Sequence, residues 1–229
     1  MSLLTGLMPR YCLLCRKRLG LGTDDSIPLC DECRAGIQPL GGLRCRRCGR
    51  PLYSEEDLCF PCRERQALCE ETVPLFLYKD EAASLLKAYK MTKRFSLASF
   101  FTVLLAEQIR LRWPDRQIVP VPPRAEKLRR REWDQVEAIA HSLEWMGFQV
   151  SRVLWRRPSR EQKILDRKNR SLNAREAYAV KPGCEPLIAG LCLILLDDVC
   201  TTGATLEACA ELLSKAGAAK VSAIVIAAD

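Results

Sequence analysis

Two adjacent carboxylates, Asp197 and Asp198, stand where an apolar run of the sequence ends. They lie within LILLDDVCTTGATL, residues 193–206, in which four apolar residues come first and small hydroxyl residues with one glycine follow. An apolar run without polar alternation is typical of a central parallel strand, and sheets of such strands bind ligands at the carboxyl ends of the strands. The sequence therefore predicts that both carboxylates lie at the ligand-binding edge of a sheet.

The residues after the carboxylates have the composition of an anion-binding turn. The stretch TTGAT falls where the strand gives way to a helical pattern, and the first N–H groups of a helix have no acceptor within it. Glycine permits close approach of the backbone, and threonine hydroxyls add donors. Carboxylates can accept hydrogen bonds from ribose hydroxyls, and the turn beside them can bind a 5′-phosphate. Together they predict a binding site for a sugar phosphate. Its predicted residues are Asp197, Asp198, Thr201, Thr202, Gly203, Ala204 and Thr205.

Eight of the thirteen cysteines form four CxxC pairs near the amino terminus. Two residues between thiolates let both sulfur atoms of a tight turn bind one ion, and two such turns complete a tetrahedral zinc site. The first and third pairs precede short strand patterns, whereas the second and fourth open short helices, so the segment has the pattern of an internal duplication. The predicted metal ligands are Cys12, Cys15, Cys30, Cys33, Cys45, Cys48, Cys59 and Cys62.

The pairing of these turns is open between two arrangements. The duplication favours sequential pairing, in which the first two pairs bind one zinc ion and the last two bind another; a cross-braced arrangement is the alternative. We expect one or two structural ions, which supply folding energy that so short a segment cannot draw from a core. The other cysteines are Cys69, which lies outside the pattern, and Cys184, Cys192, Cys200 and Cys209, which we expect to be reduced and mostly buried.

The elements that must position these residues follow from hydrophobic periodicity. We expect strands over 72–78, 117–123, 148–155, 191–199 and 221–228, helices over 80–91, 96–113, 133–146 and from Leu206 to Gly217, and a mobile loop over 156–176. The last strand, helix and strand predict a βαβ unit. The predicted fold class is α/β, with a mostly parallel sheet flanked by helices over 71–229 and a small four-cysteine zinc-binding region over 1–70.

The charge balance is basic, with 36 Lys and Arg against 28 Asp and Glu, a net charge of +8. Most of the excess lies in 124–131 and 152–175, which fits phosphate-bearing partners, although a solubilising surface has the same composition. No apolar run is long enough to span a membrane and no signal-peptide pattern opens the chain, so we expect a cytoplasmic protein. The only histidine, His141, falls on an expected helix, which argues against histidine-dependent hydrolysis.

The stretch LILLDDVCTTGAT resembles the 5-phosphoribosyl-1-pyrophosphate motif of type I phosphoribosyltransferases across thirteen positions. The resemblance implies that the protein binds phosphoribosyl pyrophosphate with Mg²⁺ and, as an enzyme, transfers the pentosyl group to an unidentified acceptor. Such a transition state resembles an oxocarbenium ion, so the protein must position the reactants and stabilise the departing anion. Asp197 and Asp198 would then be the catalytic residues.

Further motifs resemble the ComF family, which joins a cysteine-rich zinc domain to a phosphoribosyltransferase domain, over nearly the whole chain. YKMTKR at 89–94 is similar to its LKY-type segment, IVPVP at 118–122 to the approach to the pyrophosphate loop, and RRREWDQ at 129–135 to a basic RRGFNQ-like stretch. The expected hood loop resembles a Q…R-x-x-N…AF pattern that ends in AY at 177–178. The ligand-binding residues that this resemblance adds are Lys90, Arg130, Arg131, Gln135, Gln162, Arg170 and Asn173.

The resemblance leaves more than one function open. Glu132 and Asp134 depart from the usual Gly and Asn of the basic stretch. The family is associated with natural competence and use of external DNA, which favours either a magnesium-dependent phosphoribosyltransferase or a non-catalytic protein that binds single-stranded DNA, with competence or helicase proteins as partners. In the second case the pocket would be a ligand sensor, and Trp133 and Trp155 would be the base-stacking candidates. A zinc-stabilised regulatory domain resembling repressors of this fold is a third possibility.

Overall fold

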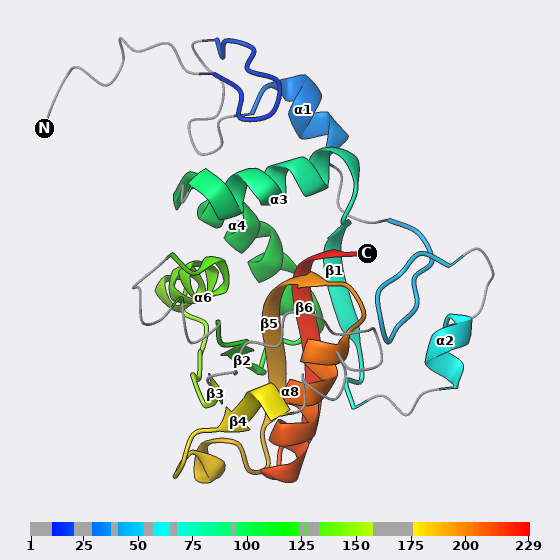
Figure 1. Ribbon diagram of the computed structural model, residues 1–229, viewed down its shortest axis with the longest axis vertical. Coiled ribbons are helices and arrows are strands. Elements are labelled where there is room, and N and C mark those ends of the chain that lie inside the picture. Colours follow the sequence, from blue (N-terminus) through cyan, green and yellow to red (C-terminus); the bar gives the residue numbers. More distant parts are fainter. Residues whose placement is uncertain are drawn as a thin grey trace, which may run out of the picture.

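The computed structural model shows one α/β body with two cysteine-rich units beside it (Figure 1). The residues that the structure describes are 11–20, 29–37, 41–52, 57–64, 68–92, 95–123, 127, 133–157 and 176–229. Within these ranges, no helix is both long enough and apolar enough to cross a membrane.

Four parallel strands form the central sheet, in the order β1-β6-β5-β2. Their bounds are Thr72–Leu77 for β1, Gln117–Pro120 for β2, Cys192–Cys200 for β5 and Lys220–Ala228 for β6. The last residue of β2, Pro120, pairs with Leu196. Asp197 and Asp198 therefore continue β5 beyond the end of its neighbour β2, at the carboxyl edge of the sheet.

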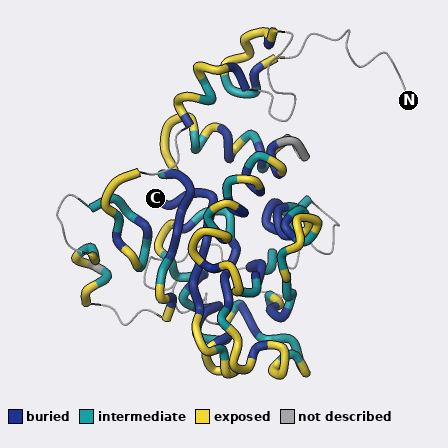
Figure 2. The backbone as a smooth tube through the Cα atoms, turned by 180° about the vertical axis from the view of Figure 1, so that it is seen from behind, coloured by how far each residue is buried: buried dark blue, intermediate teal, exposed yellow. Residues whose placement is uncertain are grey.

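Both faces of the sheet are covered, as the unbroken apolar runs predict. On β5, Ile194 and Leu196 belong to the hydrophobic cluster on one face, whereas Leu193 and Leu195 belong to the cluster on the other. Successive side chains of a strand point to opposite faces, so a strand buried on both sides needs apolar residues at every position. Figure 2 shows these central strands among the most buried parts of the chain.

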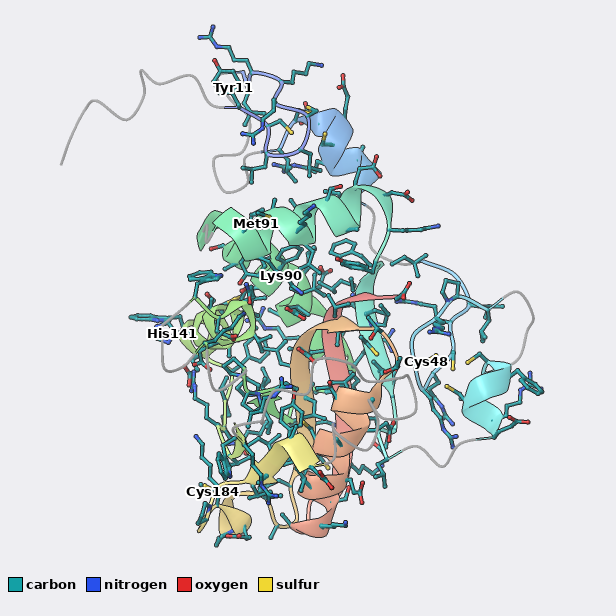
Figure 3. All side chains as sticks on the ribbon, in the orientation of Figure 1. Tyr11, Cys48, Lys90, Met91, His141 and Cys184 are labelled. Carbon is teal, nitrogen blue, oxygen red and sulfur yellow. The ribbon has the colours of Figure 1, made fainter. Side chains whose placement is uncertain are left out.

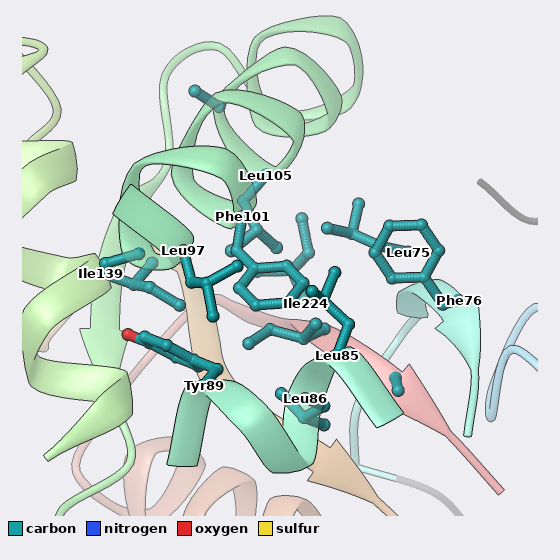
Figure 4. Packing of buried hydrophobic residues seen from close by; sticks show 14 of the residues in the cluster. Leu75, Phe76, Leu85, Leu86, Tyr89, Leu97, Phe101, Leu105, Ile139 and Ile224 are labelled. Atoms are coloured by element: carbon teal, nitrogen blue, oxygen red, sulfur yellow. The ribbon is translucent and has the colours of Figure 1, made fainter. Parts of the chain in front are cut away.

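Three helices cover one face of the sheet: α3 at Asp80–Thr92, α4 at Phe95–Arg112 and α6 at Gln135–Trp145. Their apolar side chains pack around the fully buried rings of Tyr89 and Phe101, whose centroids lie 5.3 Å apart (Figure 4). The helices expected over 80–91, 96–113 and 133–146 are thus confirmed with small shifts of their ends.

The other face is covered by α8, Ala204–Lys215, and by the antiparallel pair β3, Leu154–Arg156, and β4, Tyr178–Val180; the short 3₁₀ helix η1, Glu185–Leu187, follows. Strand β5, helix α8 and strand β6 form the predicted βαβ unit, since the two strands are parallel neighbours. The face of α8 that the sequence predicts as apolar is buried, at Leu206, Cys209, Ala210 and Leu213.

The strand expected over 148–155 is present in two pieces. Val150 forms a parallel bridge with Ile118 of β2, and β3 begins at Leu154. Between the two pieces, Arg152 is hydrogen-bonded to Glu137 of α6 at 2.6 Å and to Glu144 at 2.7 Å. The run 117–123, expected to be a strand that ends in a proline-rich loop, forms β2 as far as Pro120, and the prolines that follow lack N–H donors. The start of α6 is shifted from Trp133 to Gln135, because the Asp134 side chain accepts a hydrogen bond from Glu137 N at 2.8 Å and caps the helix. Most of the loop expected over 156–176 lies outside the described residues.

The two cysteine-rich units repeat one local design. The first cysteine unit comprises the described residues of 11–37 and the second those of 41–64. Each opens with a short antiparallel bridge, Tyr11 with Arg18 and Arg44 with Pro51, and each ends in a short helix, α1 at Asp31–Gly36 or α2 at Phe60–Arg63. The internal duplication that the sequence predicts is therefore present in the structure.

The second cysteine unit is bound to the outer edge of β1. Thr72 N donates to Arg46 O at 3.1 Å, and Arg44 Nη1 donates to Pro74 O at 3.0 Å. Gly49 has a φ of +73°, and a Cβ at this residue would lie 2.1 Å from Pro74 Cδ. Only glycine permits this approach, so the sequence of the unit is adapted to its place on the strand.

The first cysteine unit does not lie on β1 but beside the helical layer, near the start of α3 (Figure 1). Its buried residues, including Leu29 and Ile37, belong to the same hydrophobic cluster as Leu85 and Leu86 of α3. The two units thus contact different parts of the α/β body.

Candidate functional site

The two adjacent carboxylates are held in different ways. Lys90 Nζ of α3 lies 2.8 Å from Asp198 Oδ2, an ion pair in which the side chains are 37% and 22% exposed. Asp198 N donates to Asp197 Oδ1 at 2.8 Å. Figure 3 shows Lys90 on α3, beyond the carboxyl end of β5. The structure thus brings together the acidic pair and the lysine that the sequence assigns to one ligand site.

The electrostatic environment disfavours charge on Asp197. Burial, together with the negative charge of Asp198, raises the pKa of Asp197 from 3.8 to about 7. Burial also raises the pKa of Asp134, and the charge of Asp198 adds to this shift. Three carboxylates therefore share this region with Lys90. Carboxylate oxygen atoms are the ligands that Mg²⁺ prefers, so these residues are chemically suited to bind that ion.

Gln135 supports the site from behind. Its side chain is buried, donates to Lys90 O at 3.4 Å and accepts from Lys127 Nζ at 2.9 Å. Its own carbonyl oxygen accepts from the Tyr89 hydroxyl at 2.7 Å. Gln135 thus joins the start of α6 to the end of α3, which carries Lys90. Sequence reasoning did not single out Lys127, although it lies in the basic stretch 124–131.

The predicted phosphate turn begins α8. Gly203 is the N-cap residue, with φ 76° and ψ −4°, and no side chain caps the helix. Ala204 N donates to Thr202 Oγ1, but this hydrogen bond is long at 3.4 Å. Thr201 and Thr202 are exposed. An uncapped first turn with exposed hydroxyls can accept an anion, because its N–H groups need an acceptor that the helix does not supply.

Tyr178 is a neighbour of the turn to which sequence reasoning assigned no role. It lies on β4, and a side-chain hydrogen bond joins its hydroxyl to Thr205. Burial raises the pKa of Tyr178 to about 12, so the phenol stays protonated at neutral pH. The guanidinium of Arg156 on β3 lies 5.1 Å from the ring centroid. The sequence signal was the AY pair at 177–178, which aligns this tyrosine with the end of the hood pattern.

Part of the predicted ligand set falls outside the described residues. Asp197, Asp198, Lys90 and Gln135 lie together, and the turn that follows Cys200 is next to them along β5. The predicted residues that lie outside the described ranges are Arg130, Arg131, Gln162, Arg170 and Asn173.

The eight paired cysteines form two groups of four. Within each group the sulfur atoms lie within 4.8 Å of one another, and the members are Cys12, Cys15, Cys30 and Cys33 in one and Cys45, Cys48, Cys59 and Cys62 in the other. This is the sequential pairing favoured by the sequence, and it excludes the cross-braced alternative. Figure 3 shows the second group beside Cys48.

The geometry and electrostatics of both groups fit zinc. A tetrahedral ion with Zn–S bonds of about 2.3 Å requires sulfur atoms about 3.8 Å apart, and Cys15–Cys30 and Cys48–Cys59 are 3.6 Å and 3.7 Å apart. Burial opposes ionisation of Cys12 and Cys45, but backbone hydrogen bonds outweigh it and lower their pKa values to about 6 and about 7. One thiolate in each group is thus favoured even before an ion adds its charge.

The remaining cysteines behave as the sequence predicts. Cys69 belongs to neither group and is buried, and burial raises its pKa well above the ordinary value. Cys200 and Cys209 are buried, whereas Cys184 and Cys192 are half-buried, and all five are free thiols. Cys69, Cys200 and Cys209 belong to the hydrophobic cluster on the α8 face of the sheet, and Cys184 packs against it, so these four serve as packing residues.

Comparisons with known proteins match two separate parts of the chain to domain families. Residues 3–63 match the double zinc ribbon domain, and residues 151–229 match the phosphoribosyl transferase domain. The competence protein ComFC of Streptococcus pneumoniae is 28% identical, covering 92% of this chain and 96% of that protein. The DNA utilization protein YhgH of Salmonella typhimurium is also 28% identical, covering 93% and 95%, and ComFC of Bacillus subtilis is 26% identical, covering 96% of both chains.

A solved glutamine phosphoribosylpyrophosphate amidotransferase from Bacillus subtilis matches 57% of this chain at 16% identity, with a TM-score of 0.38, and covers 26% of that protein. A score this low carries no argument about function.

The cysteine groups and the parallel sheet, together with these matches, define a protein that joins a double zinc ribbon to a phosphoribosyltransferase-like domain. Relatives named ComFC and YhgH align with nearly the whole chain. The resemblance to the ComF family that the sequence motifs indicate is thereby confirmed.

Proposed function

We propose that this chain is a cytoplasmic protein that binds 5-phosphoribosyl-1-pyrophosphate with Mg²⁺ and transfers its phosphoribosyl group to an acceptor not yet identified. The observation that carries the proposal is the pairing of Asp198 with Lys90 directly before the uncapped turn at Gly203. Carboxylates, a cation and the N–H groups at the start of a helix are the groups that a sugar bearing a phosphate and a pyrophosphate requires. The domain division at residue 70 is part of the same proposal.

Each part of the ligand has a complementary part of the site. Asp197 and Asp198 accept hydrogen bonds from the two ribose hydroxyls, and the turn at 201–205 binds the 5′-phosphate at the start of α8. The side chain of Lys90 is 37% exposed, so its ammonium group can exchange its contact with Asp198 for one with a phosphate oxygen. Mg²⁺, when bound, would neutralise negative charge on the departing pyrophosphate.

The names of the relatives suggest where this chemistry is used. ComFC is described as a competence protein and YhgH as a DNA utilization protein. We propose that the present chain also serves the uptake or use of external DNA, with a base in nucleic acid as one candidate acceptor.

Calorimetric titration with phosphoribosyl pyrophosphate and Mg²⁺ tests the ligand. We expect the wild type to bind and the Asp197→Asn/Asp198→Asn variant to lose at least about tenfold in affinity, since two charge-assisted hydrogen bonds are weakened. Asp115→Asn is the matched control, because Asp115 is an exposed carboxylate in the turn between α4 and β2. Equal binding by the wild type and the double variant would place the ligand elsewhere, and no binding by either would reject the proposal.

A second candidate, a non-catalytic protein that binds single-stranded DNA, is favoured by the surface of the ribbons. Tyr11 is 51% exposed beside the basic stretch 16–18, and Phe60 is 69% exposed on the same short helix as Arg63. Exposed aromatic rings among cations are a stacking platform for unpaired bases. Trp133, a stacking candidate from the sequence, instead packs edge-on against Tyr89 in the core, at 6.1 Å. Trp155 is 38% exposed.

Fluorescence polarisation with a labelled oligothymidine separates the two functions. The second candidate requires salt-sensitive binding that weakens in Tyr11→Ala and Phe60→Ala, with phosphoribosyl pyrophosphate binding unchanged. Binding that is the same in these variants and in the wild type would remove the ribbon surface from consideration.

A further inference from the structure

We propose that Arg50 of the second zinc ribbon is a positioning residue for the phosphate turn of the other domain. The inference rests on the proposed function, since it assigns a support to the same turn. The second ribbon would then hold the phosphate turn in its binding conformation, although none of its residues contacts the ligand.

Arg50 reaches two carbonyl groups at the carboxyl edge of the sheet. Its Nε donates to Asp229 O at 2.9 Å, and its Nη2 lies 3.4 Å from Thr201 O. Asp229 N in turn donates to Cys200 O at 3.0 Å. One guanidinium therefore joins the residue that follows β6 to the residue that follows β5, just where the phosphate turn begins.

The backbone that carries Arg50 is held in place. The preceding residue is Gly49, whose backbone lies against the Pro74 ring, and the ribbon makes two further hydrogen bonds to β1 through Arg44 and Arg46. The four-cysteine group that contains Cys48 holds the same turn of the ribbon. Because the backbone of Arg50 is held in place, its guanidinium can orient the oxygen atoms that accept its hydrogen bonds, which a side chain on a mobile backbone could not do.

The contact with Thr201 O sets the direction of the next donor. In a trans peptide the C=O and N–H bonds point in nearly opposite directions. A carbonyl group of Thr201 that is turned toward Arg50 therefore turns the N–H of Thr202 away from the ribbon. This N–H is the first of the turn, and Gly203 and the start of α8 follow it. Arg50 thus preorganises the donors, which lowers the ordering cost of anion binding.

The test compares Arg50→Gln and Arg50→Lys with Arg63→Gln. Arg63 is a matched control, since it is an exposed arginine of the same ribbon whose Nε donates within the ribbon, to Leu58 O at 3.0 Å. Calorimetry would measure phosphoribosyl pyrophosphate binding, amide hydrogen exchange would measure opening of 201–205 without ligand, and metal analysis would confirm equal zinc content.

We expect Arg50→Gln to weaken binding by roughly three- to tenfold, the range for net loss of one ordinary hydrogen bond, and to speed exchange in 201–205. Arg50→Lys should recover part of the affinity, because an ammonium group keeps the charge but lacks the planar fork. Arg63→Gln should match the wild type in both measurements.

Two results would overturn the inference: exchange in 201–205 that is unchanged in Arg50→Gln, or wild-type affinity in Arg50→Lys, which would reduce the role to charge alone. Since exchange needs no ligand, it decides the role of Arg50 even if the wild type does not bind phosphoribosyl pyrophosphate. Failure of the proposed function and failure of this inference are therefore distinguishable.

Discussion

At the scale of single residues, the proposed ligand site contains groups whose local energies are unfavourable. Asp197 is a carboxylate beside another carboxylate in a partly buried place. Gly203 has a backbone conformation that other residues rarely adopt, and it caps a helix without a side chain. Such features are retained when a ligand benefits from them, and each can be measured separately from binding.

Asp197 predicts a specific dependence of stability on pH. Its pKa is about 7 in the folded protein against an ordinary 3.8, so between about pH 4 and pH 7 the folded chain binds a proton that the unfolded chain lacks. The contribution of this residue to stability is therefore greatest below pH 4 and falls as the pH rises to 7. Asp197→Asn should raise the free energy of unfolding at pH 8 by roughly 1 to 3 kcal/mol, with no gain near pH 4.

Urea unfolding of both proteins at several pH values measures this difference, with Asp115→Asn as the exposed control. The variant keeps the acceptor for Asp198 N, because an amide oxygen replaces the carboxylate oxygen. A gain that is the same at pH 4 and pH 8 would show that charge on Asp197 is not its source.

Gly203→Ala separates backbone strain from ligand binding. Its φ is +76°, so alanine should cost about 1 kcal/mol of stability, and a less well-formed turn should weaken binding of phosphoribosyl pyrophosphate. Gly183 has nearly the same φ, +78°, and open space around it, but it lies before η1. Thermal unfolding should show similar losses in Gly203→Ala and Gly183→Ala, whereas titration should show weaker binding in the first variant alone.

At the scale of elements, local sequence patterns were sufficient to predict those strands and helices whose structure depends mainly on their own residues. The unbroken apolar run predicted β5 as a buried strand, and the periodicity after it predicted the inner face of α8. The CxxC spacing and the duplicated contexts favoured the correct cysteine pairing. The apolar residues of 148–155 predicted one continuous strand, but the structure has a bridge at Val150 and strand β3 from Leu154. Between them Arg152 pairs with two carboxylates of α6, a contact that apolar periodicity does not predict.

The contact of the second ribbon with β1 predicts very different costs for two glycines of one unit. Gly49→Ala would put Cβ 2.1 Å from the rigid Pro74 ring, so the ribbon must move, with an expected loss of more than about 3 kcal/mol. Gly42→Ala has a similar φ of +80° and open space around it, and should lose only about 1 kcal/mol. Chemical unfolding compares the two, and equal losses would contradict close packing of Gly49 against β1.

At the scale of the whole molecule, the contacts that complete the site join residues distant in the chain. Arg50 and Thr201 are 151 positions apart, and Lys90 meets Asp198 across the carboxyl edge of the sheet. The resemblance to a family indicated Lys90 and the AY pair that contains Tyr178, but no local pattern marks Arg50. The role of Arg50 arises from where the fold places it, and periodicity within one element carries no such information.

Zinc content should follow the two cysteine groups independently. Native mass spectrometry should find two zinc ions per wild-type chain and one in Cys12→Ser or Cys48→Ser, since each group has its own four ligands. Cys184→Ser, which alters a half-buried cysteine outside both groups, should retain two. Loss of both ions in either variant would show that the groups are coupled.

The position of the second ribbon on β1 also affects how this protein can associate. β1 ends the sheet, and the ribbon occupies its backbone donor at Thr72 and its acceptor at Pro74. Uncovered edge strands recruit strands from other chains and promote aggregation. The ribbon therefore prevents strands of other chains from pairing with β1. If chelation of zinc releases the ribbon from this edge, the protein should self-associate through β1. A phosphoribosyltransferase-like domain expressed without its ribbons should do the same.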